Sequence, residues 1–200
     1  MNDLDRPASP RAQARREQVL EAASECFRRK GFHGASMAEI AKTAGMSPGH
    51  IYNLFTNKED IIGAIVARDQ SKLDAIAQGM KASGDVRAAM LQHARIGVSD
   101  VTDPASAALS QEVLAEAGRN PKVAEIVQAA DARWRAQLQD LLSTIWLREG
   151  RPVPPDIAAR TEMLTTIFKG LTARAIYHPG IDRDAVAPVV QRVLAALMQD

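Results

Sequence analysis

Apolar residues recur every three or four positions along most of this chain, and the strict alternation typical of a half-buried strand is absent. This period predicts an all-α fold of about nine helices, rich in alanine. The expected helices cover residues 10–30, 37–44, 48–55, 58–80, 86–101, 104–118, 121–147, 156–177 and the region after 182.

Polar residues followed by proline mark several of the expected helix starts. A Ser, Asp or Asn side chain caps the free backbone N–H groups of a first turn, and proline suits the first helical position. Such pairs are Ser9-Pro10, Ser47-Pro48, Asp103-Pro104 and Asn120-Pro121. Ser36 and Asn57 each precede an acidic residue by three positions, in the manner of a capping box.

The segment from Ala41 to Phe55 predicts two short helices that cross at a steep angle. Gly45 supplies a turn residue that adopts positive φ without steric penalty, and Ala41 is small where the helices must approach. The apolar residues spaced to hold both helices against the first one are Ile40, Ala44, Met46, Ile51 and Leu54. Together these features indicate a helix-turn-helix.

The other face of the second short helix is then free to meet DNA, because a recognition helix enters the major groove by its N-terminal end. The candidate DNA-binding residues are Ser36, Met37, Ser47, Pro48, Gly49, His50, Tyr52, Asn53 and Lys58. Ser36 and Lys58 lie at helix N-termini, which favour phosphate. Packing in the head is the alternative for Tyr52, and a merely solvated ring is the alternative for His50.

This region resembles the DNA-binding domain of the TetR (tetracycline repressor) family. The resemblance rests on Gly45-Met-Ser-Pro-Gly-His-Ile-Tyr-Asn-Leu-Phe55 and Lys58-Glu59, with Gly31-Phe32 and Ser36-Met-Ala-Glu-Ile-Ala41 before them. Asn53-Leu54 departs from the pattern, since many relatives carry His or Tyr before the Phe, and this bears on operator preference. The resemblance implies a homeodomain-like three-helix domain over 1–56 and an effector-binding and dimerisation domain over 57–200.

Charge is uneven along the chain, although the net charge is only +1. Between Arg6 and Lys58, nine basic residues stand against four acidic ones, so the remainder is net acidic. A basic head on an acidic body favours a polyanion such as double-stranded DNA as the partner of the head, including its N-terminal tail.

Other protein classes are disfavoured. No apolar run approaches the ~20 residues that span a bilayer, and the N-terminus lacks the apolar core of a secretory signal. The single cysteine, Cys26, cannot form an internal disulfide, which suits the cytoplasm. HExxH and CxxC motifs are missing, and the four histidines lack metal-ligand spacing. We expect no enzymatic activity, cofactor, metal or membrane partner.

The family resemblance implies an effector pocket among the fourth to eighth helices. Candidate lining residues lie on apolar or mixed helix faces, and ordinary core packing is the alternative for each of them. They are Met90, His93, Ile96, Leu109, Val113, Trp134, Leu138, Met163, Ile167 and Phe168. The expected effector is a largely apolar small molecule whose identity the sequence does not give.

Two apolar stripes on the last two helices predict a four-helix interface between two copies of the chain, because each stripe is wider than one neighbour covers. The candidate interface residues are Leu164, Phe168, Leu171, Ala175, Val186, Val189, Val190, Val193 and Leu197.

Taken with the sequence pattern, the family resemblance implies a ligand-responsive repressor that binds a near-palindromic operator as a homodimer. A ligand-independent architectural DNA-binding protein with the same head and a filled body is the alternative. An enzyme with a pocket in its helical bundle is a third and weaker hypothesis.

Overall fold

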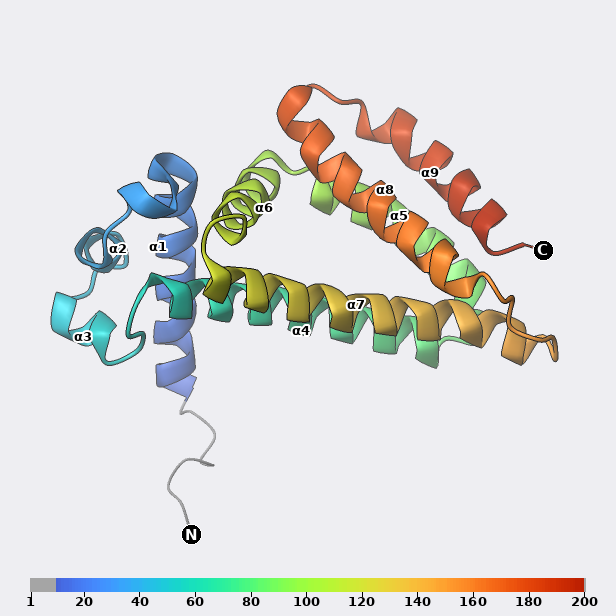
Figure 1. The fold of residues 1–200 in the computed structure, drawn as a ribbon, viewed down its shortest axis with the longest axis horizontal. Coiled ribbons are helices and arrows are strands. Elements are labelled where there is room, and N and C mark those ends of the chain that lie inside the picture. The colour runs from blue at the N-terminus through green and yellow to red at the C-terminus, as the bar shows by residue number, and fades with distance from the viewer. Residues whose placement is uncertain (1–9, 200) are drawn as a thin grey trace, which may run out of the picture.

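The computed structural model describes residues 10–199, and these residues form nine helices joined by short loops (Figure 1). Within this range the all-α prediction is confirmed. Arg6, part of the expected basic tail, and the expected cap Ser9 lie outside it. The helices are α1 (Pro10–Gly34), α2 (Met37–Thr43), α3 (Pro48–Tyr52), α4 (Lys58–Ala82), α5 (Val86–Val101), α6 (Pro104–Ala117), α7 (Pro121–Arg148), α8 (Ile157–Tyr177) and α9 (Arg183–Leu197).

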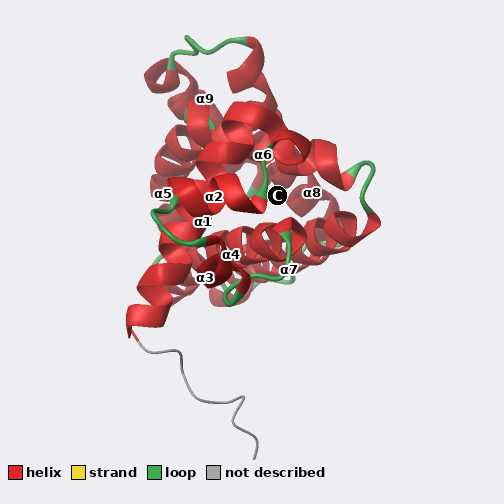
Figure 2. Cartoon of the chain, turned by 90° about the vertical axis from the view of Figure 1, so that its left-hand side faces the viewer, coloured by secondary structure: helices red, strands yellow, loops and turns green. Residues whose placement is uncertain are grey.

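Helices α1 to α3 form a head at one end of an elongated body (Figures 1 and 2). Helix α4 leaves the head and runs beside α7, while α5, α8 and α9 form a second layer against them. Helix α6 lies between the two parts, because it packs against α1 of the head as well as α7 and α8 of the body. Among these nine helices, none is both long and apolar enough to cross a membrane.

Buried apolar side chains form two clusters. The first joins the helices of the head to the start of α4, so it extends past residue 56 to Ile61, Ile62 and Ile65. The second fills the body around Trp146, which is fully buried. Burying one large apolar side chain stabilises a fold by about 1.5–3 kcal/mol, so α4 is anchored in the head by its first two turns.

The expected helix caps are present. In each case the side-chain oxygen accepts a backbone N–H of the first turn, which satisfies a donor that the helix itself leaves free. The capping residues are Ser36, Ser47, Asn57, Asp103 and Asn120. The start of the regular helices was therefore correctly indicated by local chemistry.

Helix α3 is shorter than predicted, since it ends at Tyr52 and not at Phe55. The chain continues as a turn in which the Phe55 N–H still donates to the Ile51 carbonyl at 2.9 Å. This turn places the Phe55 ring in the core of the head, where it is 3% exposed. The regular part of α3 is thus five residues long.

The turn between α2 and α3 forms around Gly45, as predicted. Gly45 has φ of +64°, and the next N–H, of Met46, donates to the Ala41 carbonyl at 2.9 Å. A Cβ added at Gly45 would meet nothing within 4 Å. The cost of a side chain at this position is therefore backbone strain and not a steric clash.

We expect Gly45→Ala to lower the free energy of unfolding by about 1–2 kcal/mol, because L-residues are strained at positive φ. Gly79→Ala is the matched control: it lies inside α4 with open space around its Cβ, so alanine should stabilise the protein by about 0.5–1 kcal/mol. Urea unfolding of both variants measures the difference. Equal effects of the two substitutions would contradict the strained turn.

Candidate nucleic-acid interface and ligand cavity

The outward side of α3 carries the polar residues that the sequence predicted there. Ile51 is completely buried beneath the helix, whereas the Tyr52 ring is 56% exposed. The exposed residues of this surface are Ser47, Pro48, Gly49, His50, Tyr52 and Asn53. The helix therefore separates a side that packs on the head from a side open to a partner.

Polar side chains of α1 hold the two short helices in place. Gln18 Nε2 donates to the carbonyl of Ala44, at the end of α2, at 2.8 Å. Arg16 Nη1 donates to the carbonyl of Leu54 at 3.1 Å, and its guanidinium lies 4.4 Å from the centre of the Phe55 ring. These contacts fix the orientation of α3 relative to α1.

Ser36 and Ser47 keep a hydrogen-bond donor while they cap their helices. The Ser36 Oγ accepts the Glu39 N–H at 3.1 Å, and the Ser47 Oγ accepts the His50 N–H at 3.3 Å. A hydroxyl that accepts one bond still has its own O–H to donate. Both serines are exposed, so each can offer that hydrogen to a phosphate, while the neighbouring Met37 is half-buried against the head.

Lys58 has a different environment from the one predicted. Its ammonium donates to the carbonyl of Ala35 at 2.8 Å and also to that of Phe32, and it lies 4.3 Å from the centre of the Phe32 ring. The side chain thus fastens the α1–α2 turn to the start of α4. A phosphate contact through this ammonium would sacrifice those bonds, so we correct the expected role of Lys58 to a structural one.

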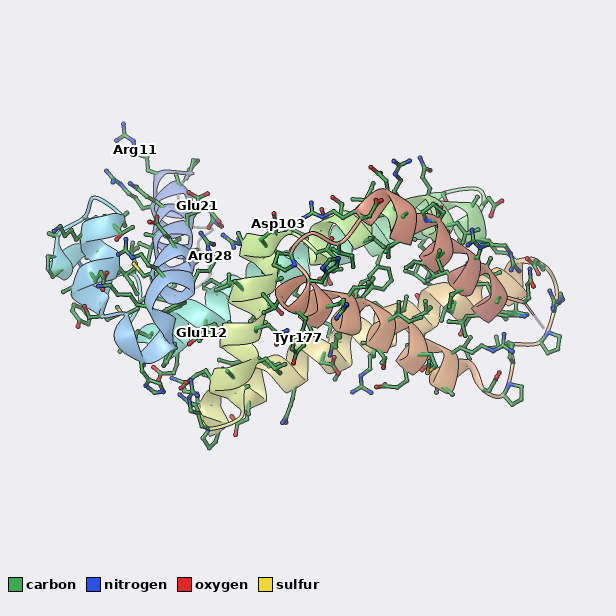
Figure 3. All side chains as sticks on the ribbon, turned by 90° about the horizontal axis from the view of Figure 1, so that it is seen from above. Arg11, Glu21, Arg28, Asp103, Glu112 and Tyr177 are labelled. Atoms are coloured by element: carbon green, nitrogen blue, oxygen red, sulfur yellow. The ribbon has the colours of Figure 1, made fainter. Side chains whose placement is uncertain are left out.

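The head is tied to α6 by the carboxylate of Glu112. Its Oε1 accepts the Phe32 N–H at 2.6 Å, and Figure 3 shows Glu112 on the part of α6 that lies beside the head. The preceding residue, Gly31, breaks the helical backbone with φ of +72°, and a Cβ there would lie 3.1 Å from the same oxygen. Glycine therefore permits both the kink and the close approach.

A second carboxylate on α6, that of Glu116, is only 1% exposed. Its oxygens lie 2.8 Å from Arg119 Nε, 3.1 Å from Asn120 Nδ2 and 3.0 Å from His33 Nε2 of the head. Burial acts to raise the pKa of Glu116, but the hydrogen bonds from Asn120 and Arg119 and the nearby charges outweigh it. The pKa is consequently lowered from its ordinary value of 4.5.

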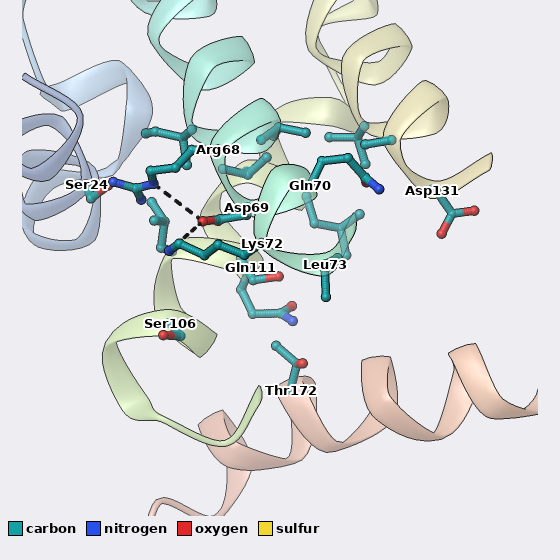
Figure 4. A pocket seen from close by; sticks show the side chains of 18 of the residues that line it. Ser24, Arg68, Asp69, Gln70, Lys72, Leu73, Ser106, Gln111, Asp131 and Thr172 are labelled. Atoms are coloured by element: carbon teal, nitrogen blue, oxygen red, sulfur yellow. Dashed lines mark hydrogen bonds and ion pairs between the residues drawn. The ribbon is translucent and has the colours of Figure 1, made fainter. Parts of the chain in front are cut away.

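A cavity of about 630 Å³ lies where head and body meet (Figure 4). Its walls come from α1, α4, α6, α7 and α8, and its volume is typical of small-molecule sites. Apolar side chains include those of Ile65, Val66, Leu109, Val113 and Trp134. The charged ones are Glu21, Arg28, Arg68, Asp69, Lys72, Asp131 and Lys169.

Three of the ten predicted pocket residues line this cavity, namely Leu109, Val113 and Trp134. Met90 and Leu138 are buried in the core of the body instead, and Ile167 and Phe168 pack against that core. Ile96 and Met163 are about half exposed, and His93 is half-buried on α5 without lining the cavity. The pocket prediction is corrected accordingly for these seven residues.

The sequence did not reveal that α1 contributes to the cavity through Glu21, Ser24 and Arg28. Charged positions on an amphipathic helix are normally solvated, so these carried no distinguishing signal. One signal was available on α4: its apolar series is interrupted by Asp69 and Gln70, and Gln70 is buried. A buried polar residue in such a series indicates a polar site within the fold.

The predicted dimer stripe is divided by the structure. Leu164, Ala175 and Val190 are buried within the chain itself, so they have no surface to offer a second copy and are removed from the prediction. The half-buried members are Phe168, Leu171, Val186 and Leu197. Val189 and Val193 are 47% and 41% exposed, and they remain candidates for an interface.

Comparison with known sequences assigns both parts of the chain. Residues 19–65 match the bacterial regulatory proteins of the tetR family, and residues 87–199 match the C-terminal domain of BetI-type transcriptional repressors. The chain therefore belongs to the TetR family of bacterial regulatory proteins.

Curated relatives resemble parts of the chain. The HTH-type transcriptional regulator UidR of Escherichia coli (strain K12) is 35% identical over 119 residues, which are 58% of this chain and 59% of UidR. The HTH-type transcriptional regulator TtgR of Pseudomonas putida is 32% identical over 75 residues, or 38% of this chain and 36% of TtgR. The chain thus spans less than two thirds of the curated relatives it matches.

Solved structures share the whole fold. Salmonella enterica GusR has a TM-score of 0.77 at 26% identity, covering 96% of this chain and 97% of GusR. FadR from Bacillus subtilis, solved in complex with stearoyl-CoA, has a TM-score of 0.76 at 20% identity, covering 89% of this chain and 96% of that one. The second likeness concerns the fold alone.

Replacing Lys58 with methionine should destabilise the protein by about 1–3 kcal/mol, because two carbonyls of the α1–α2 turn lose their donor. Lys42→Met is the control, since Lys42 is exposed on α2 and surface substitutions cost within about 0.5 kcal/mol. Thermal unfolding compares the two variants. A Lys58 variant as stable as the Lys42 variant would show that the ammonium does not hold the turn.

Stability should fall with acidity through Glu116. Because its folded pKa is lowered, the ionised carboxylate stabilises the fold above its ordinary value of 4.5, and this contribution is lost as the pH falls through the folded pKa. We expect Glu116→Gln to show a smaller loss of unfolding free energy than the wild type below about pH 4.5. Urea titrations at a series of pH values test this, and parallel curves would exclude the assignment.

Proposed function

We propose that this chain is a one-component transcriptional repressor that binds a near-palindromic DNA operator as a homodimer and is released by a small molecule. The observation that carries the proposal is the exposed polar side of α3 on a head whose apolar residues are otherwise buried. Such a helix is suited to the major groove, where Tyr52, His50 and Asn53 would meet phosphates and base edges. DNA binding implies action in the cytoplasm.

Phosphate contacts are expected to come from Ser36, Ser47 and Tyr52, with the exposed basic residues of α1 adding sequence-independent attraction. Arg11 lies at the outer end of α1 in Figure 3, away from the body. Because each neutralised phosphate releases counterions, affinity for the operator should fall steeply with salt concentration.

The homodimer would form on the exposed apolar residues of α8 and α9. They are Met163, Ile176, Tyr177, Val189 and Val193. Exposed apolar residues on these two consecutive helices support an association surface there. A two-fold dimer would present two recognition helices about 34 Å apart, one turn of DNA, to two successive major grooves.

The cavity favours effector control over the alternative of an architectural DNA-binding protein, which would need no space in its body. An effector there would touch α1 and α6 at once, and both helices position the head. The effector need only bind the state whose heads are spaced wrongly for the operator more tightly than it binds the operator-binding state. A preference of ~3 kcal/mol changes operator occupancy over a hundredfold.

The proposal is tested by footprinting the purified protein on the DNA that flanks its own reading frame, at low ionic strength. We expect two protected half-sites about one helical turn apart. Tyr52→Phe should weaken binding of the dimer roughly 25-fold on all operator variants, because each protomer loses one phosphate hydrogen bond worth about 1 kcal/mol. Ser71→Ala, which removes an exposed hydroxyl from α4 of the body, is the control and should bind as the wild type does.

Absence of any footprint would refute the proposed function. A loss confined to one base position in the Tyr52 variant would leave DNA binding intact but reassign Tyr52 to base contact.

A further inference from the structure

The cavity contains an uneven cluster of charges on α4. Asp69 lies 3.5 Å from Arg68 Nε and 3.3 Å from Lys72 Nζ, so one carboxylate serves two cations (Figure 4). Of these two contacts, the one with Lys72 is a hydrogen bond. The contact with Arg68 Nε lacks hydrogen-bond geometry. That nitrogen is buried and has no hydrogen-bond partner among residues 10–199.

A buried N–H without an acceptor is costly, and proteins rarely leave one in this state. A guanidinium is also the group best suited to binding a carboxylate, through two parallel N–H bonds. Nε itself is covered, but the Arg68 side chain is 23% exposed and lines the cavity beside Lys72. A small rotation of this side chain would present the unsatisfied donor to the cavity, where an acidic group is the acceptor it would take.

The carboxylates of the cavity are less available to a cationic ligand than Arg68 is to an acidic one. Asp131 already pairs with Lys169 and, at 2.8 Å, with Arg135. Asp69 likewise pairs with Arg68 and Lys72. Glu21 and Arg28 line the cavity from α1, but both are exposed and their charges cancel. Among residues 10–199, the buried side-chain atom that lacks a hydrogen-bond partner is thus a donor and not an acceptor.

Arg68 also connects the cavity to the head. Its Nη1 lies 3.5 Å from the Glu17 Oε2 of α1, across the boundary between α4 and α1. The acid would take Nε together with a terminal N–H, whereas Glu17 pairs with Nη1, so the two carboxylates would compete by drawing the guanidinium in different directions. Ligand binding would then weaken an ion pair that ties the head to α4.

We propose that the effector carries a carboxylate or similar acidic group, which Arg68 binds with Lys72, and that it competes with Glu17 for Arg68. This inference rests on the proposed function of the cavity as the effector site. It replaces the expectation of a largely apolar effector with that of an amphiphilic acid, whose apolar part would lie against Leu109, Val113 and Trp134.

The test follows the Arg68 Nε–H directly by NMR of arginine side chains, with the resonance assigned from its loss in Arg68→Lys. The probes are phenylacetate, mandelate and naphthoxyacetate, each compared with its uncharged primary amide. We expect at least one acid to shift this resonance in a saturable manner while its amide does not. A response to acid and amide alike, to an amide only, or to none of the acids overturns the proposal.

Two variants make opposite predictions for the acid that binds. Arg68→Gln should weaken its binding roughly tenfold and abolish the preference over the amide. Glu17→Gln should strengthen its binding a few-fold, because the competitor is removed. The matched control is Arg95→Gln: Arg95 forms an exposed ion pair with Asp184 on another face, and its loss should change neither affinity. Weaker binding in the Glu17 variant would overturn the competition.

Failure of this inference is distinguishable from failure of the proposed function. A protein that protects operator DNA and is released by a neutral or cationic compound would keep the proposed function and lose the acidic effector. A protein that binds the acids at Arg68 but gives no footprint would lose the proposed function instead.

Discussion

The position of the head depends on two carboxylates of α6. Glu112 accepts the backbone N–H of Phe32, and the buried Glu116 is held by Arg119, Asn120 and His33. A buried carboxylate that loses its partners costs several kcal/mol. The Phe32 N–H and the His33 ring are the partners that come from the head, so these two contacts favour one placement of the end of α1. The apolar packing of α1 against α6 stabilises the contact between the two helices. The polar contacts fix their relative orientation, because a hydrogen bond requires particular atoms to meet.

The same helix forms a wall of the cavity. Leu109 and Val113 of α6 line it, whereas Glu112 and Glu116 of the same helix contact the head. A molecule that displaced α6 would therefore displace the acceptors of the head as well. Helix α4 provides a second route, since its first turns are buried in the head and its later turns carry Arg68. In the proposed mechanism, effector binding and head orientation would be coupled through contacts that each have defined partners.

Local signals in the sequence predicted most of the fold. Gly45, the capping residues and the apolar period fix helices through interactions within a few residues, and such interactions can be recognised without knowing the tertiary structure. Lys58 and Arg68 could not be assigned in this way. Their partners, the carbonyls of Phe32 and Ala35 and the carboxylate of Glu17, are brought to them by packing of distant segments. A basic residue at a helix start has the same local signature whether it meets a phosphate or a carbonyl.

The dimer stripe illustrates the same limit for apolar residues. Periodicity indicates which side of a helix avoids water, but it does not distinguish burial within the chain from burial against a second copy. Val190 and Val193 lie one turn apart on α9, yet the first is 6% exposed and the second 41%. Helix α9 packs on α5 by one edge of its stripe, so the other edge, with Val189 and Val193, still exposes apolar surface. That remaining surface supports the proposal that a second copy of the chain covers this edge of α9.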